Sequence, residues 1–393
     1  MKSEKVAFGV ITRSLNQLSP FLNFLKNAKK YNHKIKYIIF GYQDIITSEI
    51  VYELKKHCEV VTIQRGNSDY LLNTLQDLKL TKKEIDALIA TPYKEKYDMV
   101  SYGTARNYVL IAAILMRLDF LIFFDTDVYP KILFEDKENR FYYEEIDFVG
   151  SHLKLLHKYN DVVVTTSDYS GYYIIPKMNF PHLNDLLYGV QKENSFNIIS
   201  HENKLVIKHN HQRNIHKTNK ILGGNLAIDL RKLKLLSPFF STNLVMDGEC
   251  FLGRGEDTLF GPLINKYGGR CLDIDLPIFH NCFGDFPNVP DIFQKKNLDR
   301  FFYACMGWII RNPFYNWIHP DNKENLNEEI KKKRYDALIK GSQKAAEYFN
   351  DIRFLKLPKA FKLSYHKLPE NIEKFHRLLD AWNNLKNYLK DNN

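Results

Sequence analysis

Short apolar runs alternate with amphipathic segments over the first third of the chain, and this alternation restricts the fold more than any other feature. The runs at 5–12, 34–40 and 59–64 predict strands, and the segments at 19–30 and 47–57 predict helices. Strands that alternate with helices pair in parallel through right-handed crossovers, and their ligands bind beyond the carboxyl ends of the strands. The sequence therefore predicts an α/β protein with a Rossmann-like N-terminal half.

A further predicted strand ends in two carboxylates. Residues 121–129 read Leu-Ile-Phe-Phe-Asp-Thr-Asp-Val-Tyr and follow a predicted helix at 102–117. A continuous apolar run suggests a strand buried on both faces, so Asp125 and Asp127 should lie at its exposed end. Two carboxylates separated by one residue can face the same Mg²⁺ or Mn²⁺, and a metal with open positions can hold a diphosphate. The motif alone also fits an ordinary acidic turn.

Composition sets the class of protein. The chain has 393 residues, 45% of them hydrophobic, so it can bury a large core, and its net charge of +10 favours anionic partners. The basic residues are spread along the chain without a nucleic-acid-binding signature, which argues against nucleic acid. Five cysteines without C-x-x-C spacing indicate a reducing compartment, and neither a signal peptide nor a membrane-spanning stretch is apparent. We expect a cytoplasmic protein, with peripheral contact at the inner face of the membrane as the alternative.

The second half of the chain is less regular. Residues 147–151, 161–166 and 171–175 predict short strands. Beyond about residue 291 the sequence becomes rich in aromatic residues and in lysine-rich amphipathic runs. We expect a catalytic domain at 1–295 and a mostly α-helical C-terminal extension at 296–393.

Three loops at predicted strand or helix ends carry candidate ligand-binding residues. Thr12 and Arg13 follow the first strand and Asp44 the second, where a Rossmann-like sheet contacts a base, ribose or phosphate. Arg106 opens the helix before the Asp-x-Asp strand. It can bind a diphosphate as a bidentate cation, or it can form a salt bridge with one of the metal carboxylates.

Two later segments carry further titratable groups. Glu256 and Asp257 follow Gly253-Arg254-Gly255 at the start of a predicted helix. One acid can hydrogen-bond an acceptor while the other takes its proton, although acids are also common helix caps. His280 ends a predicted strand at 277–280 and is either a third metal ligand or a partly buried polar residue.

Together and in this order, these segments resemble a GT-A fold glycosyltransferase. The features in common are the Rossmann-like half, an Ala-Arg-Asn helix running into Asp-x-Asp, a Gly-Gly-Asn strand at 222–229, Gly-Glu-Asp and a late histidine. They cover residues 5–285, and their spacing is similar to that of the large inverting family of bacterial synthases and transferases. The resemblance implies a GT-A mixed sheet with flanking helices.

The resemblance also implies roles on the donor side. Asp125 and Asp127 would hold Mn²⁺ or Mg²⁺ against the diphosphate, with Thr126 between them and His280 completing the ligand set. The donor sugar would be lined by the strand residues Gly223, Gly224 and Asn225. The loop at Thr12 and the turn after the second strand depart from the family's usual Pro-Thr-Tyr-Asn and Asp-Asp-Gly-Ser forms. The donor base, uridine or guanosine, is therefore left open.

The implied reaction moves a sugar from a nucleotide sugar to an acceptor hydroxyl on a glycan, glycolipid or small molecule. Asp257 would be the base and Glu256 an acceptor contact, which makes inversion the expected outcome and a retaining GT-A reaction the alternative. Two more distant alternatives are a haloacid-dehalogenase-type phosphatase and a non-catalytic glycan-binding adaptor. The phosphatase signature usually has Thr or Val where this chain has Tyr129.

Overall fold

The computed structural model describes residues 4–44, 46–64, 69–89, 100–202, 204–284 and 286–391. Its largest sheet has eight strands in the order β11-β15-β7-β12-β4-β1-β2-β3. These strands are β1 (Val6–Thr12), β2 (Ile35–Tyr42), β3 (Glu59–Gln64), β4 (Phe120–Phe124), β7 (Val162–Thr166), β11 (His216–Lys217), β12 (Asn225–Asp229) and β15 (Arg270–Asp273).

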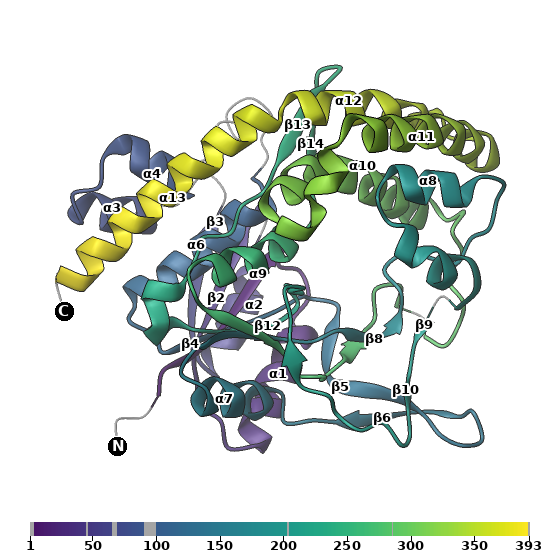
Figure 1. Ribbon diagram of the computed structural model, residues 1–393. Helices are drawn as coiled ribbons and strands as arrows, with labels where there is room; N and C mark the ends of the chain where they lie inside the picture. The colour runs from purple at the N-terminus through teal and green to yellow at the C-terminus, as the bar shows by residue number, and fades with distance from the viewer. Residues whose placement is uncertain are drawn as a thin grey trace.

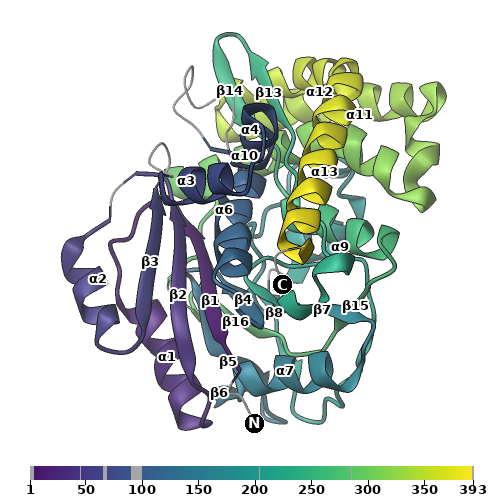
Figure 2. The ribbon, with the colours of Figure 1, turned by 90° about the vertical axis from the view of Figure 1, so that its left-hand side faces the viewer.

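The four strands β1 to β4 are parallel and lie side by side in Figure 2. All five residues of β4 are buried, as its continuous apolar run predicts. Strand β12 is antiparallel to β4 and to β7, so the sheet is mixed. The predicted α/β architecture is therefore confirmed.

A smaller sheet receives the chain directly after the Asp-x-Asp turn. Its order is β10-β5-β16-β8-β9, and β6 pairs with β5. The strands are β5 (Val128–Glu135), β6 (Phe141–Glu145), β8 (Tyr169–Tyr172), β9 (Lys204–Leu205), β10 (Ile207–Lys208) and β16 (Ile278–His280). In its register His280 pairs with Val128, one residue beyond Asp127. Asp125 and Asp127 thus occupy the turn that joins the two sheets.

Helices cover both faces of the large sheet. One face packs on α1 (Ser19–Lys30), α2 (Ser48–Lys55) and α7 (Phe148–Lys158). The other face packs on α3 (Asp69–Asp77), α4 (Lys82–Ile89), α6 (Tyr102–Leu115), α9 (Glu256–Lys266) and α13 (Leu368–Asp391). Each face has its own hydrophobic cluster of buried side chains, which gives the three-layer arrangement of an α/β domain.

The strand predicted at 147–151 is wrong, because this segment begins helix α7. Asp147 caps the helix through a hydrogen bond from Gly150 N to its carboxylate, 2.8 Å long. The buried residues of α7 then recur at helical spacing, at Phe148, His152 and Leu155. The predicted strand at 171–175 is shifted, since β8 ends at Tyr172.

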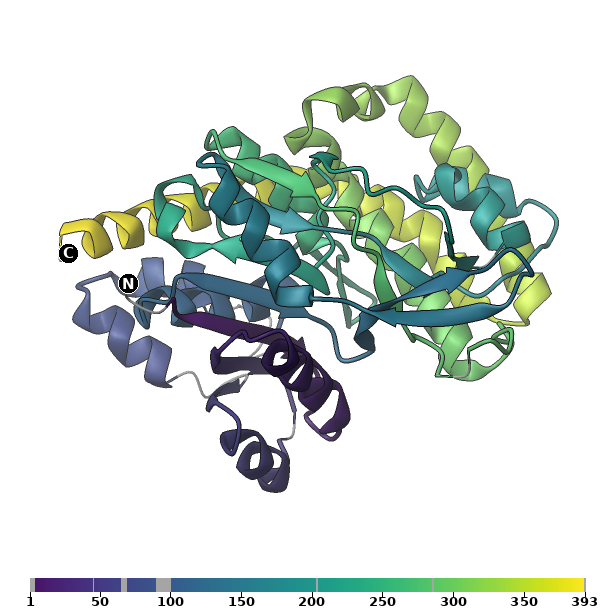
Figure 3. The same cartoon turned by 90° about the horizontal axis from the view of Figure 1, so that it is seen from below.

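The segment 296–393 is mostly helical, as predicted, and it packs against the rest of the chain. Its helices are α10 (Lys295–Ile318), α11 (Glu328–Phe349), α12 (Leu357–His366) and α13. Helix α13 lies beside α4 in Figures 1 and 2, and α11 lies beside α8 (Leu183–Gly189) in Figures 1 and 3. The hairpin of β13 (Asn243–Met246) and β14 (Glu249–Leu252) joins the cluster of α8, α10, α11 and α12. No helix in the described part of the chain has the length and apolar character needed to span a bilayer.

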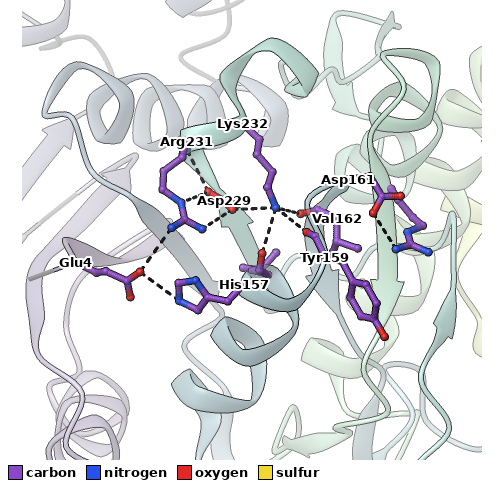
Figure 4. A network of polar contacts seen from close by, with 10 residues as sticks. Glu4, His157, Tyr159, Asp161, Val162, Asp229, Arg231 and Lys232 are labelled. Atoms are coloured by element: carbon purple, nitrogen blue, oxygen red, sulfur yellow. Dashed lines mark hydrogen bonds and ion pairs between the residues drawn. The ribbon is translucent and has the colours of Figure 1, made fainter. Parts of the chain in front are cut away.

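A network of charged side chains lies at the end of β12 that is opposite the Asp-x-Asp turn (Figure 4). Asp229 ends β12 and is fully buried. Arg231 donates to both of its carboxylate oxygens at 2.8 Å. The ammonium of Lys232 lies 3.1 Å from the same carboxylate and donates to the carbonyl oxygens of Leu156, Tyr159 and Val162. The buried charge of Asp229 is thereby compensated by two cations.

We expect Trp382→Ala to destabilise the whole protein by about 3–5 kcal/mol, the usual cost of removing a buried tryptophan. Trp382 is fully buried in the cluster that also contains α4 and α6, and its Nε1 donates to Leu236 O at 2.9 Å. Urea unfolding followed by circular dichroism measures the effect, with Leu355→Ala, at a side chain 52% exposed, as the control. An unchanged unfolding midpoint in Trp382→Ala would contradict this packing.

Candidate active site

The predicted site residues converge because β12 enters the sheet next to the end of β4. The antiparallel register pairs Asn225 with Phe124, so Gly224 lies beside Asp125. A Cβ atom on Gly224 would come within 2.4 Å of Asp125 Oδ2 and 2.6 Å of the Tyr169 hydroxyl. The Tyr169 hydroxyl accepts a hydrogen bond from Gly224 N at 3.0 Å. Glycine at 224 therefore permits a contact between backbone and carboxylate that any side chain would block.

A buried ion pair fixes the position of the glycine pair. Arg106, 4% exposed, donates from Nε to Glu256 Oε1 at 2.8 Å and from Nη1 to Gly223 O at 3.2 Å. Its guanidinium also lies over the rings of Phe123 and Phe239. Although burial opposes ionisation, Glu256, Asp125 and Asp257 together raise the pKa of Arg106.

These contacts correct two predicted roles. Arg106 does not face a diphosphate, because Glu256, Gly223 and two aromatic rings surround its guanidinium. Its Nη2 lies 3.9 Å from Asp125 Oδ1, so the salt-bridge alternative is the one observed. Glu256 is 6% exposed and is bound to Arg106, so it is not available as an acceptor contact.

The two Asp-x-Asp carboxylates and His280 lie together at the junction of the sheets. His280 Nε2 is 3.2 Å from Asp127 Oδ2, and the His280 ring lies 4.9 Å from the Tyr169 ring. The side chains of Asp125 and Asp127 are 38% and 36% exposed, so both can be reached by a ligand. No group of three or more His, Cys, Asp or Glu side chains in the described residues is arranged to hold a metal on its own.

Electrostatics distinguishes the two carboxylates. Burial raises the pKa of Asp125 to about 6, helped by Asp127 and Asp257 and opposed by Arg106 and His280. Burial acts on Asp127 in the same direction, but His280 and Arg300 lower its pKa below the usual value. Besides its neighbour Asp127, three groups from other segments of the chain, Arg106, Asp257 and His280, therefore influence the charge of Asp125.

Asp257 occupies the first turn of α9 and contacts Gly223, whose neighbour Gly224 lies against Asp125. Its Oδ2 accepts from Gly223 N at 2.8 Å, and its Oδ1 accepts from Thr258 N at 2.7 Å. The preceding Gly255 has φ of 88°, a left-handed conformation that suits glycine. Oδ1 also accepts from the Thr258 hydroxyl at 3.4 Å, whereas Oδ2 keeps a lone pair, so these hydrogen bonds orient Asp257 without occupying it fully.

Asn225 has a different place from the one predicted. It is fully buried, and its amide donates to the carbonyl oxygens of Asp168 and Leu276. Its Oδ1 is bonded to Nε2 of His152, 3.1 Å away. Because its side chain is occupied on every side, Asn225 supports the strand rather than lining the donor sugar.

The loops after β1 and β2 meet at the same end of the sheet. Arg13 Nε lies 3.1 Å from Asp44 Oδ2, and the Arg13 side chain is 85% exposed. The Thr12 hydroxyl donates to Ser14 O at 3.0 Å, and Thr126 lies in the turn after β4. Thr12, Arg13, Asp44 and Thr126 stay predicted donor contacts, placed at the carboxyl ends of parallel strands.

Sequence reasoning missed several residues near this site. Tyr169 contacts both Gly224 and His280. Arg300 and Arg311, on α10, act electrostatically on Asp127 and Asp257 respectively. They are eleven residues apart, about three helical turns, and so share one face of the helix. That spacing is visible in the sequence, but the surface that this face meets is not.

Comparison with known proteins gives similarity in structure only. No family model matches the sequence, and no curated protein matches it either. Glucosyl-3-phosphoglycerate synthase from Mycobacterium tuberculosis, solved with Mn²⁺, UDP and phosphoglyceric acid, is 11% identical with a TM-score of 0.36, over 77% of this chain and 78% of that one. S. aureus TarS is 12% identical with a TM-score of 0.36, over 93% of this chain and 55% of TarS. A mycobacterial protein is 13% identical with a TM-score of 0.38, over 79% and 75% of the two chains.

We expect the protein to lose stability in acid through His152. Burial lowers the pKa of His152 from 6.5 to about 4. The unfolded chain takes up a proton near pH 6.5, whereas the folded chain resists until about pH 4. The free energy of unfolding therefore falls as the pH drops through this window, by up to about 3 kcal/mol. Urea titrations at pH 7.5, 6 and 5 measure this fall in the free energy of unfolding for the wild type and for His152→Gln. The difference between the two proteins isolates His152, since other titrating groups contribute equally to both proteins. Equal pH dependence in the two proteins would exclude His152 as the cause.

Proposed function

We propose that the chain is a metal-dependent glycosyltransferase that moves a sugar from a nucleoside-diphosphate sugar to an acceptor hydroxyl with inversion. One observation carries the proposal. Gly224 lies against the Asp125 carboxylate, and the amide of the adjacent Gly223 donates to Asp257. A carboxylate of a candidate metal site and a candidate base therefore flank one small backbone segment, where a donor sugar can be accommodated.

The donor set suits a hard divalent cation. Asp125, Asp127 and His280 supply carboxylate oxygens and one imidazole, which Mn²⁺ or Mg²⁺ accepts. Among the residues that the structure describes, no group of three or more His, Cys, Asp or Glu side chains is arranged to hold a metal ion on its own. We therefore infer that oxygen atoms of the diphosphate would supply further ligands, as is common for Mg²⁺. When bound, the metal would neutralise the charge that develops on the departing diphosphate.

The side chains of the protein supply the rest of the reaction. Asp257 takes the proton of the acceptor hydroxyl as its oxygen forms a bond to the anomeric carbon, and the bond from that carbon to the diphosphate breaks. Arg300, which lowers the pKa of Asp127, adds positive charge on the diphosphate side. Arg106 positions both glycines and the two acids around them. The donor is of UDP or GDP type, and a glycan, glycolipid or small molecule accepts the sugar.

We expect UDP or GDP to raise the melting temperature only in the presence of Mn²⁺ or Mg²⁺. A ligand at a hundred times its dissociation constant adds about 2.7 kcal/mol to the stability of the native state. Asp125→Asn and Asp127→Asn should abolish this stabilisation while leaving the unliganded melting temperature within about 2 °C. Asp161→Asn is the matched control, because Asp161 is 58% exposed and pairs with Arg270. Full stabilisation in Asp127→Asn, or in EDTA, would remove the metal assignment.

Asp257→Asn should retain nucleotide binding and lose turnover. The amide oxygen can still accept from Gly223 N, while the hydrogen bond from Thr258 N to Oδ1 is lost, and the group can no longer take a proton. Loss of a general base lowers the rate by about 10²- to 10⁴-fold. The rate is measured as the release of nucleoside diphosphate from the nucleotide sugar that raises the melting temperature of the protein, with water as the acceptor. A collapse of nucleotide affinity instead would place Asp257 on the donor side.

A further inference from the structure

Lys192 and Arg311 both lie close enough to Asp257 to interact electrostatically with its carboxylate. Lys192 precedes the short helix Glu193–Ser195, and its ammonium lies 5.1 Å from the ring of Trp308 on α10. Arg311 follows Trp308 by three residues and is 5% exposed. The two segments are joined by hydrogen bonds, one from Asn312 Nδ2 to Val190 O at 2.9 Å and a pair between Gln191 and Asn316. The position of Lys192 against α10 is therefore well defined.

Arg311 reaches the helix that carries the candidate base. A Cβ atom on Gly255 would lie 2.7 Å from Arg311 Nη1, so the guanidinium rests against the residue that precedes Glu256 and Asp257. Asp257 attracts both cations, and it is among the charges that raise the pKa of Lys192 and of Arg311 against the effect of burial. Both cations thus border the space around the Asp257 carboxylate.

Arg311 differs from the other buried arginines. Arg106 and Arg334 are 4% and 5% exposed, and each has a carboxylate partner, Glu256 at 2.8 Å and Glu193 at 3.2 Å. Within the part of the chain that the structure describes, neither Arg311 nor Lys192 has a carboxylate within 4.0 Å. The hydrogen bonds that Arg311 donates go to the neutral amide of Asn312.

Unpaired cations in this position are costly. Burial, together with the nearby charges of Arg311 and Lys220, lowers the pKa of Lys192 to about 7. A buried charge without a counter-ion destabilises a fold, and such conflicts are expected where a ligand supplies the missing charge. An arginine fork beside an ammonium is suited to a phosphate or a carboxylate.

Building on the proposed function, we propose that Lys192 and Arg311 form the acceptor subsite and that the acceptor carries an anionic group, a phosphate or a carboxylate. This group would sit between the two cations, which brings a hydroxyl of the same molecule to Asp257. Trp308 would shield the ion contact from water and so strengthen it. The acceptor is then a small anionic hydroxyl compound or the anionic end of a larger one.

The test compares three probes that share one sugar ring: glucose, glucose 6-phosphate and glucuronate. Binding of each to the full chain is measured by thermal shift and calorimetry, both with saturating Mn²⁺ and nucleoside diphosphate and without them. We expect glucose 6-phosphate or glucuronate to bind at least about tenfold more tightly than glucose, since one charge-assisted contact contributes about 1.5–3 kcal/mol. The anion that binds identifies the group.

Lys192→Met separates binding from stability. The variant keeps the aliphatic stem over Trp308 and removes the charge, so we expect the anion preference to fall to about twofold while the unliganded melting temperature rises by about 1–3 °C. Lys131→Met is the matched control. Lys131, on β5, also has its ammonium over an aromatic ring, 3.6 Å from the centre of the Tyr143 ring. That variant should keep the full preference.

Equal binding of all three probes to the wild type would overturn the acceptor subsite, as would an unchanged preference in Lys192→Met. Binding of nucleoside diphosphate with Mn²⁺ is judged separately from the preference for the anionic probes. If nucleoside diphosphate with Mn²⁺ fails to bind but the anion preference persists and depends on Lys192, the donor proposal fails and the anion site remains.

Discussion

The ion pair between Arg106 and Glu256 holds the candidate active site together. One guanidinium bonds to an acid from α9 and to the backbone of Gly223, and it lies near Asp125 at the end of β4. Because breaking a buried pair leaves an uncompensated charge, these three elements can hardly move independently. The pair thereby fixes the spacing between the metal carboxylates and Asp257. Catalysis of the proposed kind depends on such fixed spacing rather than on any one acid.

The C-terminal helices pack against the rest of the chain and also contribute charged side chains to the candidate active site. Arg300 and Arg311 of helix α10 interact electrostatically with Asp127 and Asp257, so one helix face contributes positive charge to both candidate acids. Helix α13 packs on α4 and shares the cluster of α6. The segment set apart in the sequence as an extension thus supplies Arg311, one of the two cations that we assign to an anionic acceptor.

The sequence predicted those features that depend on local periodicity. Strands β1 and β4, helices α1 and α6, and the turn at Asp125 follow from apolar runs and capping residues within about ten positions. The roles of Arg106, Glu256 and Asn225 could not be predicted, because their partners lie 150, 150 and 73 residues away in the chain. The wrong strand at 147–151 has a local cause, because its short apolar run fits either a strand or a helix until Asp147 is recognised as a cap.

The central claim is that Asp125, Asp127 and His280 share one cation with a nucleoside diphosphate, beside a sugar site bordered by Gly223 and Gly224. The most direct measurement is anomalous diffraction from crystals grown with Mn²⁺ and the nucleoside diphosphate that stabilises the protein. We expect a manganese peak within coordination distance of Asp127 and of the diphosphate. A manganese peak elsewhere, or a nucleotide bound away from the end of β4, would contradict it.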